Sequence, residues 1–402
     1  MKKNVLLMLF MTTILCGCTK GEPSLMDYKQ YGDKINGFIP QIGETKLLFK
    51  HSLEETVKDD GEDYFYNYCP SIKIENDSDM HVYYCTNKDW GAVVDYIGYR
   101  TAKVVKNELK FKDEELVLEP TPDTWDRTHT CDPSVIKGEF KYEGEDYSYL
   151  MAYLGCVPWD CTLNETGIAV SKTPNGPWVK CNGTRKSDGA PINPIVPYTD
   201  FNWATNSWGT GQASLVSVDG KGRVMLFTTC GVKDGSFMNI REYDFSDISE
   251  YKLIREEKKC FEDGIVGGSK RVNNGDFCYD PVNKRFYMAK GRSPFGGDGM
   301  TPNFIADQVD VYYVDASSYE NAFDIFFDKN RVNGWKHFAT VDSSLTGYPR
   351  NHNTGLVTDE YGHMYMSDRL CVGTTSSQYG TQAAMSYLKT YRIYVTTFAV
   401  PE

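Results

Sequence analysis

A weak internal repeat is the feature of this sequence that most restricts its fold. Five segments share a small or polar first residue, an apolar strand, a turn rich in Asp, Asn or Gly, and a second strand rich in aromatic residues. They begin at Cys69, Asp132, Gln212, Asp276 and Asn353, at intervals of 63, 80, 64 and 77 residues. Because such a unit cannot bury its apolar face alone, the five are expected to pack against one another in one array.

The local pattern indicates that each unit is made of β-strands. No long stretch keeps the 3.6-residue apolar period of a helix, and short apolar or alternating runs are separated by Gly, Asn, Asp and Pro. In the second unit, TGIAVSK is followed by TPNGPW, where Pro174, Asn175 and Gly176 suit a tight turn. We therefore predict an all-β, five-bladed β-propeller, since closure into a ring limits the exposed strand edges. Two β-sandwiches are the alternative, and they do not explain five similar units.

The N-terminus has the layout of a secretory signal. Lys2 and Lys3 precede an apolar run from Val5 to Leu15, which is too short to span a bilayer. The motif LCGC at the end of this run resembles the bacterial lipobox, so residues 1–17 are predicted to be a signal peptide and Cys18 the lipid anchor. An ordinary signal peptide is the alternative. The prediction is an exported lipoprotein of the cell envelope, at the outer membrane and facing either the periplasm or the cell surface.

The remaining chain is expected to form a single domain. Residues 18–402 make up the propeller, in which residues 18–60 supply a linker and a closing strand. The segment after Met385 is the other piece expected to close the ring.

The mature chain is acidic. Removing residues 1–17 takes away two lysines and no acidic residue, which changes the formal net charge from -12 to -14. A surface of this charge repels phosphate backbones and anionic lipid headgroups, so nucleic acid is excluded as a partner. We expect a monomer that contacts the membrane only through its lipid.

The cysteines are expected to be mostly buried thiols. Cys85, Cys230 and Cys278 lie in apolar, strand-like runs, where a small buried thiol is the simplest interpretation. Cys156 and Cys161, on either side of VPWD, are the best candidates for a disulfide in an exported chain. Because no pair has the Cys-x-x-Cys spacing typical of zinc sites, no metal site is predicted.

Several motifs resemble one family of enzymes. CDPSVI, YLMAYLG and ETGIAVSKTPNGPW resemble the first blades of five-bladed propeller glycoside hydrolases, the group around glycoside hydrolase family 43, and GTGQASLVSVDGKGRVMLF and NNGDFCYDPVNKRFYM resemble later blades. The resemblance spans roughly residues 65–370. It implies cleavage of an oligo- or polysaccharide in a pocket over the axis, with no cofactor required, although Ca²⁺ or another ion on the axis is compatible with it. Where that family presents acids in successive blades, this chain has Cys69, Asp132 and Gln212.

Two of the five equivalent positions hold the carboxylates that such chemistry requires. Asp132 and Asp276 are predicted to face each other across the axis as the base-or-nucleophile pair. If the second strand of the unit returns to the same face, the loop after YLMAYLG overhangs the pocket, and this makes Glu165 the candidate general acid, with Asp160 behind it. The separation of the carboxyl groups stays open, and with it the choice between inversion and retention.

The same face is predicted to bind the sugar. Flat aromatic rings can stack on sugars, and arginine can hold a hydroxyl or a carboxylate. The predicted substrate-binding residues are Trp125, Trp159, Trp203, Trp208, Gln212, Arg292, His352, Asn353 and Arg369. His129 is a weaker candidate, and Trp178 is expected to pack in a turn.

A non-catalytic function is the alternative to hydrolysis. Cys69 and Gln212 stand where acids are expected, which favours a glycan-binding lipoprotein of a polysaccharide-utilisation system. A phosphorolytic enzyme would need a cluster of basic residues for phosphate, and the sequence has no clear one.

Overall fold

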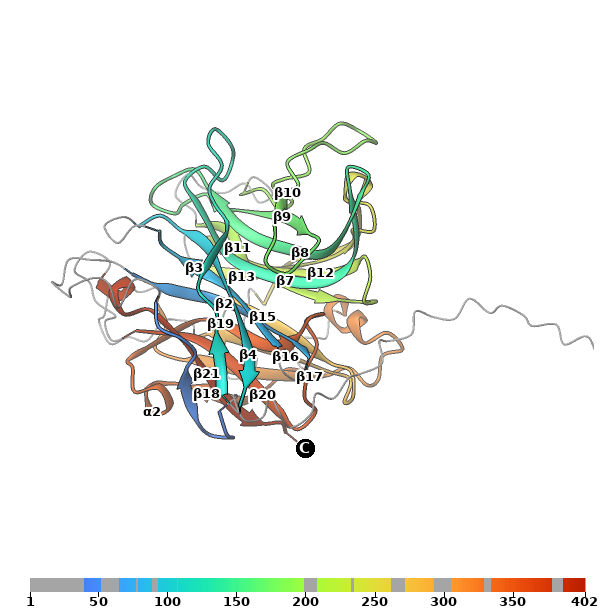
Figure 1. The fold of residues 1–402 in the computed structure, drawn as a ribbon. Coiled ribbons are helices and arrows are strands. Elements are labelled where there is room, and N and C mark those ends of the chain that lie inside the picture. Colours follow the sequence, from blue (N-terminus) through green and yellow to red (C-terminus); the bar gives the residue numbers. More distant parts are fainter. Residues whose placement is uncertain are drawn as a thin grey trace, which may run out of the picture.

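The computed structural model describes residues 40–51, 65–76, 79–88, 93–106, 108–198, 208–232, 235–261, 272–292, 305–328, 334–377 and 386–401. These residues form curled antiparallel sheets grouped around a common centre (Figure 1). The predicted all-β fold class is therefore confirmed.

Five blades follow one another along the chain. Blade I contains β2 (Asn67–Asn76), β3 (Asp79–Thr86), β4 (Tyr96–Val105), β5 (Glu108–Phe111) and β6 (Glu115–Leu118). Blade II contains β7 (His129–Tyr142), β8 (Glu145–Cys156), β9 (Glu165–Ser171) and β10 (Val179–Lys180). Blade III contains β11 (Gly209–Ser217), β12 (Arg223–Val232), β13 (Gly235–Asp244) and β14 (Lys252–Cys260). Blade IV contains β15 (Asn273–Asp280), β16 (Arg285–Gly291), β17 (Val309–Asp315) and β18 (Lys336–Val341). Blade V contains β19 (Arg350–Asp359), β20 (Arg369–Ser377), β21 (Arg392–Ala399) and β1 (Thr45–Leu47).

The first and last described strands meet in blade V. β1 pairs with β21 in antiparallel fashion, so the N-terminal segment supplies the outermost strand of this blade. β19 also pairs in parallel with β2 of blade I, with Val357 opposite Ile72. This pairing joins the first and last blades into one continuous sheet and closes the ring.

A β-bulge recurs near the start of the innermost strand of every blade. At each bulge one residue other than glycine has a positive φ: 48° at Cys69, 49° at Asp132, 47° at Gln212, 51° at Asn274 and 43° at Asn353. The pairing with the second strand shifts at the same place in all five blades. Bulges of this kind re-aim a side chain, and positive φ is uncommon outside glycine, so their recurrence identifies the structural repeat.

The fourth position of the predicted repeat is wrong by two residues. The bulge residue of blade IV is Asn274, not Asp276. Asparagine tolerates positive φ better than most residues, and Gly275 then occupies the place that Pro133 has in blade II. The repeat visible in the sequence instead aligns two aspartates.

Asp276 belongs to a second ring of equivalent residues. Each of its members lies two residues after the bulge and accepts a backbone N–H from the next blade. The pairs are Val135 N to Ser71 Oγ (3.3 Å), Leu215 N to Ser134 Oγ (2.9 Å), Phe277 N to Ser214 Oγ (3.0 Å) and Leu356 N to Asp276 Oδ2 (2.6 Å). At the fifth position a side chain on Gly355 would meet the Pro70 carbonyl oxygen at 1.7 Å, because β19 and β2 pair directly there.

Apolar side chains fill the spaces between neighbouring blades. Phe227 of blade III stacks on Phe277 of blade IV with 4.1 Å between ring centroids. Between blades I and II, Trp178 packs edge-on against Tyr83, as expected for a packing residue. Cys230 and Cys278 are buried and form no disulfide, which confirms the prediction for these two cysteines.

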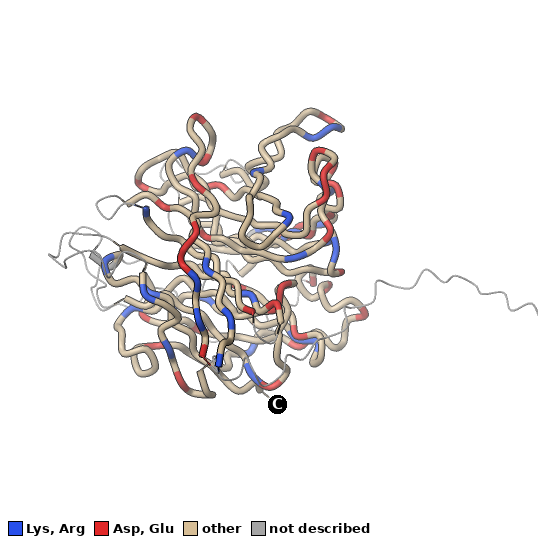
Figure 2. Tube along the Cα trace, in the orientation of Figure 1, with Lys and Arg blue, Asp and Glu red and all other residues tan. Residues whose placement is uncertain are grey.

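Charged residues of both signs are interspersed along the described strands and loops (Figure 2). Within the described part of the chain, no helix is long and apolar enough to cross a membrane.

Candidate active site

The five bulge residues converge at one end of the propeller axis. They and the residues that follow them line a cavity of about 30 Å³. A volume of this size holds about one water molecule.

Asp132 supplies a buried carboxyl group to this cavity. Its side chain is 6% exposed, and it accepts hydrogen bonds from the Cys69 thiol and from the backbone N–H of Gln212. Burial is the main cause that raises the pKa of Asp132 to about 7, and the charge of Asp95 acts in the same direction. Such a group can take up or release a proton near neutral pH.

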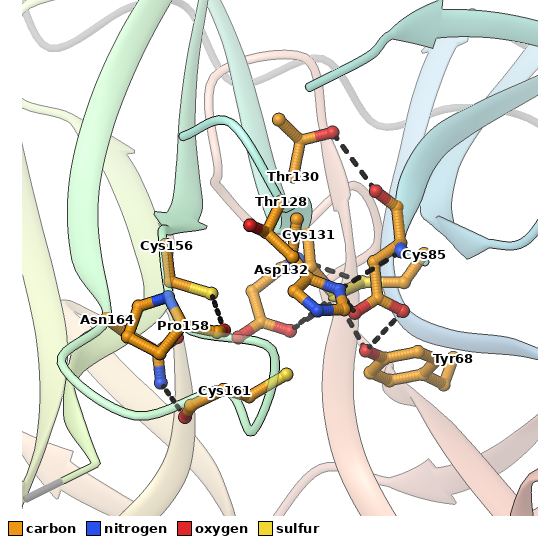
Figure 3. Close-up of polar contacts among 12 residues, drawn as sticks. Tyr68, Cys85, Thr128, Thr130, Cys131, Asp132, Cys156, Pro158, Cys161 and Asn164 are labelled. Atoms are coloured by element: carbon orange, nitrogen blue, oxygen red, sulfur yellow. Dashed lines mark hydrogen bonds and ion pairs between the residues drawn. A yellow bond between two sulfur atoms is a disulfide. The ribbon is translucent and has the colours of Figure 1, made fainter. Parts of the chain in front are cut away.

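A disulfide between blades I and II packs against Asp132 (Figure 3). It links Cys85 of β3 to Cys131 of β7, and the two sulfur atoms lie 3.7 and 3.2 Å from Asp132 Oδ1. The backbone N–H of Asp132 donates to Cys85 Sγ at 2.9 Å. The disulfide therefore helps to exclude water from this side of the carboxyl group.

The predicted cysteine pairing is wrong in two respects. Cys85, predicted to be a free thiol, is bonded to Cys131, whereas Cys156 and Cys161 are both free. The bonded cysteines are separated by 46 residues and meet only because blades I and II pack together. Proximity in the sequence favours the other pair.

The opposite wall of the cavity consists of amides. Asn274 Nδ2 contacts Asn353 Oδ1 and lies 2.8 Å from His352 Nε2. Burial lowers the pKa of His352 to about 3, so this histidine is neutral at physiological pH. His352 lies behind the cavity wall and supports Asn274.

Two buried acceptor atoms of the lining residues have no hydrogen-bond partner among the described residues. They are Gln212 Oε1 and Asn274 Oδ1. A buried acceptor without a partner is costly, so these oxygens are suited to accept hydrogen bonds from a bound ligand. The residues that carry these oxygens line the cavity together with Asp132 and come from two further blades.

Glu165 begins β9 at the same end of blade II. Its side chain is half-buried and accepts a hydrogen bond from the backbone N–H of Tyr198 at 3.3 Å. Burial raises the pKa of Glu165 to about 7, so it holds a proton over part of the neutral range. It does not line the cavity. Asp160 lies in the exposed loop before it and accepts a hydrogen bond from the Thr162 hydroxyl.

Asp276 lines the cavity but differs from Asp132 in its contacts. Its carboxylate accepts the N–H of Leu356 and lies near the buried ammonium group of Lys73, which partly offsets the rise in its pKa caused by burial. Asp132 and Asp276 are thus not equivalent members of a pair facing each other across the axis. Asp276 has the position of Ser71, Ser134 and Ser214 in the ring of contacts between blades.

The predicted tryptophans occupy different environments. Trp159 is 72% exposed in the loop between β8 and β9, and Trp208 packs over Gly211 and Leu154 next to Gln212. Trp125 instead covers Gly155 and Gly167 in blade II, where it packs against Tyr153. Trp203 lies outside the described residues.

The two predicted arginines lie at opposite ends of their blades. Arg292 follows β16 at the cavity end and pairs with Asp307 at 3.1 Å. Arg369 begins β20 at the far end of blade V, where it pairs with Asp368, so its predicted position on the cavity face is wrong. The sequence pattern indicates HMYMSD as the second strand of this unit, but that strand begins at Arg369.

Sequence reasoning misses Asn274 and Asp95. The Asn-Gly pair at residues 274–275 is an available signal for positive φ. Asp95 has no such signal, because only the packing of blade I on blade II brings it near Asp132 and His129.

The fold and the site define a five-bladed β-propeller with a buried carboxyl group in an axial cavity. No protein-family model matches the sequence, and a comparison with curated protein sequences finds no match. Among solved structures, the fold is similar to that of a family 117 glycoside hydrolase from the marine bacterium Zobellia galactanivorans, with 11% identity, a TM-score of 0.53, and coverage of 94% of this chain and 94% of that one. An alpha-L-arabinofuranosidase from Lactobacillus brevis has 9% identity and a TM-score of 0.50, over 84% of this chain and 92% of that one. These likenesses confirm the predicted propeller fold.

Proposed function

We propose that this protein is a glycoside hydrolase that cleaves a glycosidic bond of an oligo- or polysaccharide over the propeller axis. The observation that carries the proposal is the buried carboxyl group of Asp132, with its pKa of about 7, beside the unpartnered oxygens of Gln212 and Asn274. A carboxyl group tuned to neutral pH within a ring of polar groups suits acid–base chemistry on a hydroxylated ligand. The propeller fold shared with solved glycoside hydrolases supports it.

The chemistry needs two carboxyl groups in opposite protonation states. Asp132, once ionised, activates water or attacks the anomeric carbon, and Glu165 gives its proton to the leaving oxygen. The cavity has room for about one water molecule next to Asp132, which favours the activation of water.

The surrounding residues are assigned to sugar binding. Gln212, Asn274 and Asn353 hold hydroxyl groups from the cavity floor, and Trp159 and Trp208 offer rings for stacking above it. No cofactor is required for this reaction. The same oxygen atoms would suit Ca²⁺ as a ligand set on the axis.

A panel of plant, microbial and host glycans, scored for released sugar, tests this function. We expect the wild-type protein to release sugar from at least one of them. The matched control for Asp132→Asn is Asp219→Asn, the same change in the turn between β11 and β12, at the end of blade III away from the cavity. We expect this variant to remain active, whereas Asp132→Asn should lose most of its activity.

Two outcomes would contradict this proposal. Release that is unchanged in Asp132→Asn would remove the proposed role of the axial carboxyl group. Tight glycan binding without release of sugar would favour the non-catalytic alternative. Cys69 and Gln212, which stand where acids are expected, are consistent with that alternative.

We also propose that the protein is a lipoprotein of the cell envelope, anchored through Cys18. The basic start, the short apolar run and the LCGC motif support this assignment. Cys18 lies outside the described residues. Incorporation of labelled fatty acid that persists in Cys18→Ser would refute the anchor.

A further inference from the structure

Three side chains that commonly bind metals lie together beside the axial cavity. His129 opens β7 and is paired directly with Cys156, the last residue of β8. Cys161 returns to this point from the following loop, and one ligand atom from each of the three residues lies within 4.8 Å of the others. Zinc bonds of about 2.3 Å to sulfur and about 2.0 Å to nitrogen fit inside such a triangle.

The imidazole of His129 is held as metal-binding histidines usually are. Its Nδ1 lies 2.8 Å from Asp95 Oδ2, and Asp95 Oδ1 accepts the Tyr68 hydroxyl at 3.1 Å. The other ring nitrogen, Nε2, is buried, the residue is only 1% exposed, and the imidazole forms a hydrogen bond with the Cys161 thiol. A carboxylate on one nitrogen and a metal on the other is the recurrent arrangement in zinc proteins.

The loop is shaped to bring Cys161 back to Cys156 (Figure 3). Cys161 and Leu163 have positive φ values of 52° and 54°, uncommon for these residues. Asn164 Nδ2 donates to the Cys161 carbonyl oxygen at 2.7 Å, and the Cys161 N–H donates to the Pro158 carbonyl oxygen at 3.3 Å. These contacts hold the third ligand in place without help from an ion.

We propose that His129 Nε2, Cys156 Sγ and Cys161 Sγ bind one Zn²⁺ ion, with water as a fourth ligand. Thiolates and imidazole are the donors that zinc prefers, and three protein ligands plus water complete a tetrahedron. The ion would fasten the loop that carries Trp159 to β7, three residues before Asp132. The spacing argument from the sequence misses this site because its cysteines are five residues apart and its histidine comes from the preceding strand.

A disulfide between Cys156 and Cys161 is the competing state. This disulfide would use both sulfur atoms and leave His129 as the last of the three ligands, so the disulfide and the zinc site exclude each other. The proposal is independent of the proposed hydrolase activity, since it concerns binding of the metal alone.

Titration of the metal-free mature protein with Co²⁺ tests the proposal, under conditions that keep Cys156 and Cys161 as thiols and the Cys85–Cys131 disulfide intact. We expect one Co²⁺ per chain, with a thiolate-to-cobalt charge-transfer band and the visible bands of tetrahedral cobalt, both lost when Zn²⁺ is added. Cys161→Ser removes a ligand from a half-buried position and should weaken binding by more than about 100-fold, because even loss of a supporting partner costs about 10–100-fold. Asp95→Asn should weaken it within that smaller range.

Cys371→Ser is the matched control. This thiol is also buried, but its side-chain hydrogen bonds are with the hydroxyl groups of Tyr365 and Thr397 rather than with other metal-binding groups. The variant should bind Co²⁺ as the wild-type protein does. Absence of stoichiometric binding, or binding unchanged in Cys161→Ser, would overturn the proposal. So would mass spectrometry showing Cys156 linked to Cys161 in metal-free protein isolated from the cell envelope.

Discussion

Replacement of Asp132 by asparagine is expected to lower the rate of glycan cleavage by about 10²–10⁴-fold, the usual contribution of a general acid or base. Asparagine keeps the size of the side chain and cannot take up a proton. Because the residue sits at a bulge with a φ of 49°, a position that asparagine tolerates well, the backbone should be retained. The loss would therefore report on the carboxyl group rather than on the fold.

The same substitution is expected to make the protein more stable above neutral pH. The pKa of Asp132 is raised from its ordinary value of 3.8 to about 7 in the folded protein. Between these values the folded protein keeps a proton that the unfolded chain has lost, so the free energy of unfolding falls as the pH rises. The pKa difference corresponds to a loss on the order of 4 kcal/mol, complete above about pH 7. Asparagine carries no such penalty.

Urea unfolding of both proteins at about pH 4 and about pH 8 measures this effect. The two proteins should be similar at the lower pH, and the variant should be more stable at the higher pH. A variant that is inactive and also no more stable at the higher pH would contradict the buried, desolvated state of Asp132. The Asp219→Asn control should keep its activity, which separates the role of the axial carboxyl group from a general effect of removing a carboxylate.

The repeat makes the fold predictable, because each blade carries its own local signals. The sequence places Asp132, Gln212 and Asn353 at their true positions, since a polar residue before an apolar strand marks the bulge in each of these blades. In blade IV the signal is ambiguous: Asn274 and Asp276 both lie shortly before the apolar run that begins at Phe277, and only the pairing of β15 with β16 decides between them.

Contacts between blades cannot be predicted from the sequence. The meeting of Cys85 with Cys131, and of Asp95 with His129, depends on how far blade II is rotated against blade I. The spacing of residues along the sequence does not determine that rotation. The raised pKa of Asp132 cannot be predicted from the sequence either, because its main cause is burial by residues from other strands.

Removal of the disulfide by the double substitution Cys85→Ala and Cys131→Ala is expected to lower the free energy of unfolding by about 4 kcal/mol. A cross-link over 46 residues restricts the unfolded chain, and the loop-entropy relation gives a value of this size. Since a domain has only about 5–15 kcal/mol of stability, the loss should be large in urea unfolding.

Reduction of the disulfide provides the matched control for this prediction. A reducing agent should destabilise the wild-type protein by a similar amount and leave the double variant unchanged, because the other described cysteines form no disulfide. Reduction that destabilises both proteins equally would show that another cross-link matters. Since the sulfur atoms pack against Asp132, the double variant should also admit water to this carboxyl group. The pKa of Asp132 should then move back toward its ordinary value, and the fall in stability with pH should become shallower.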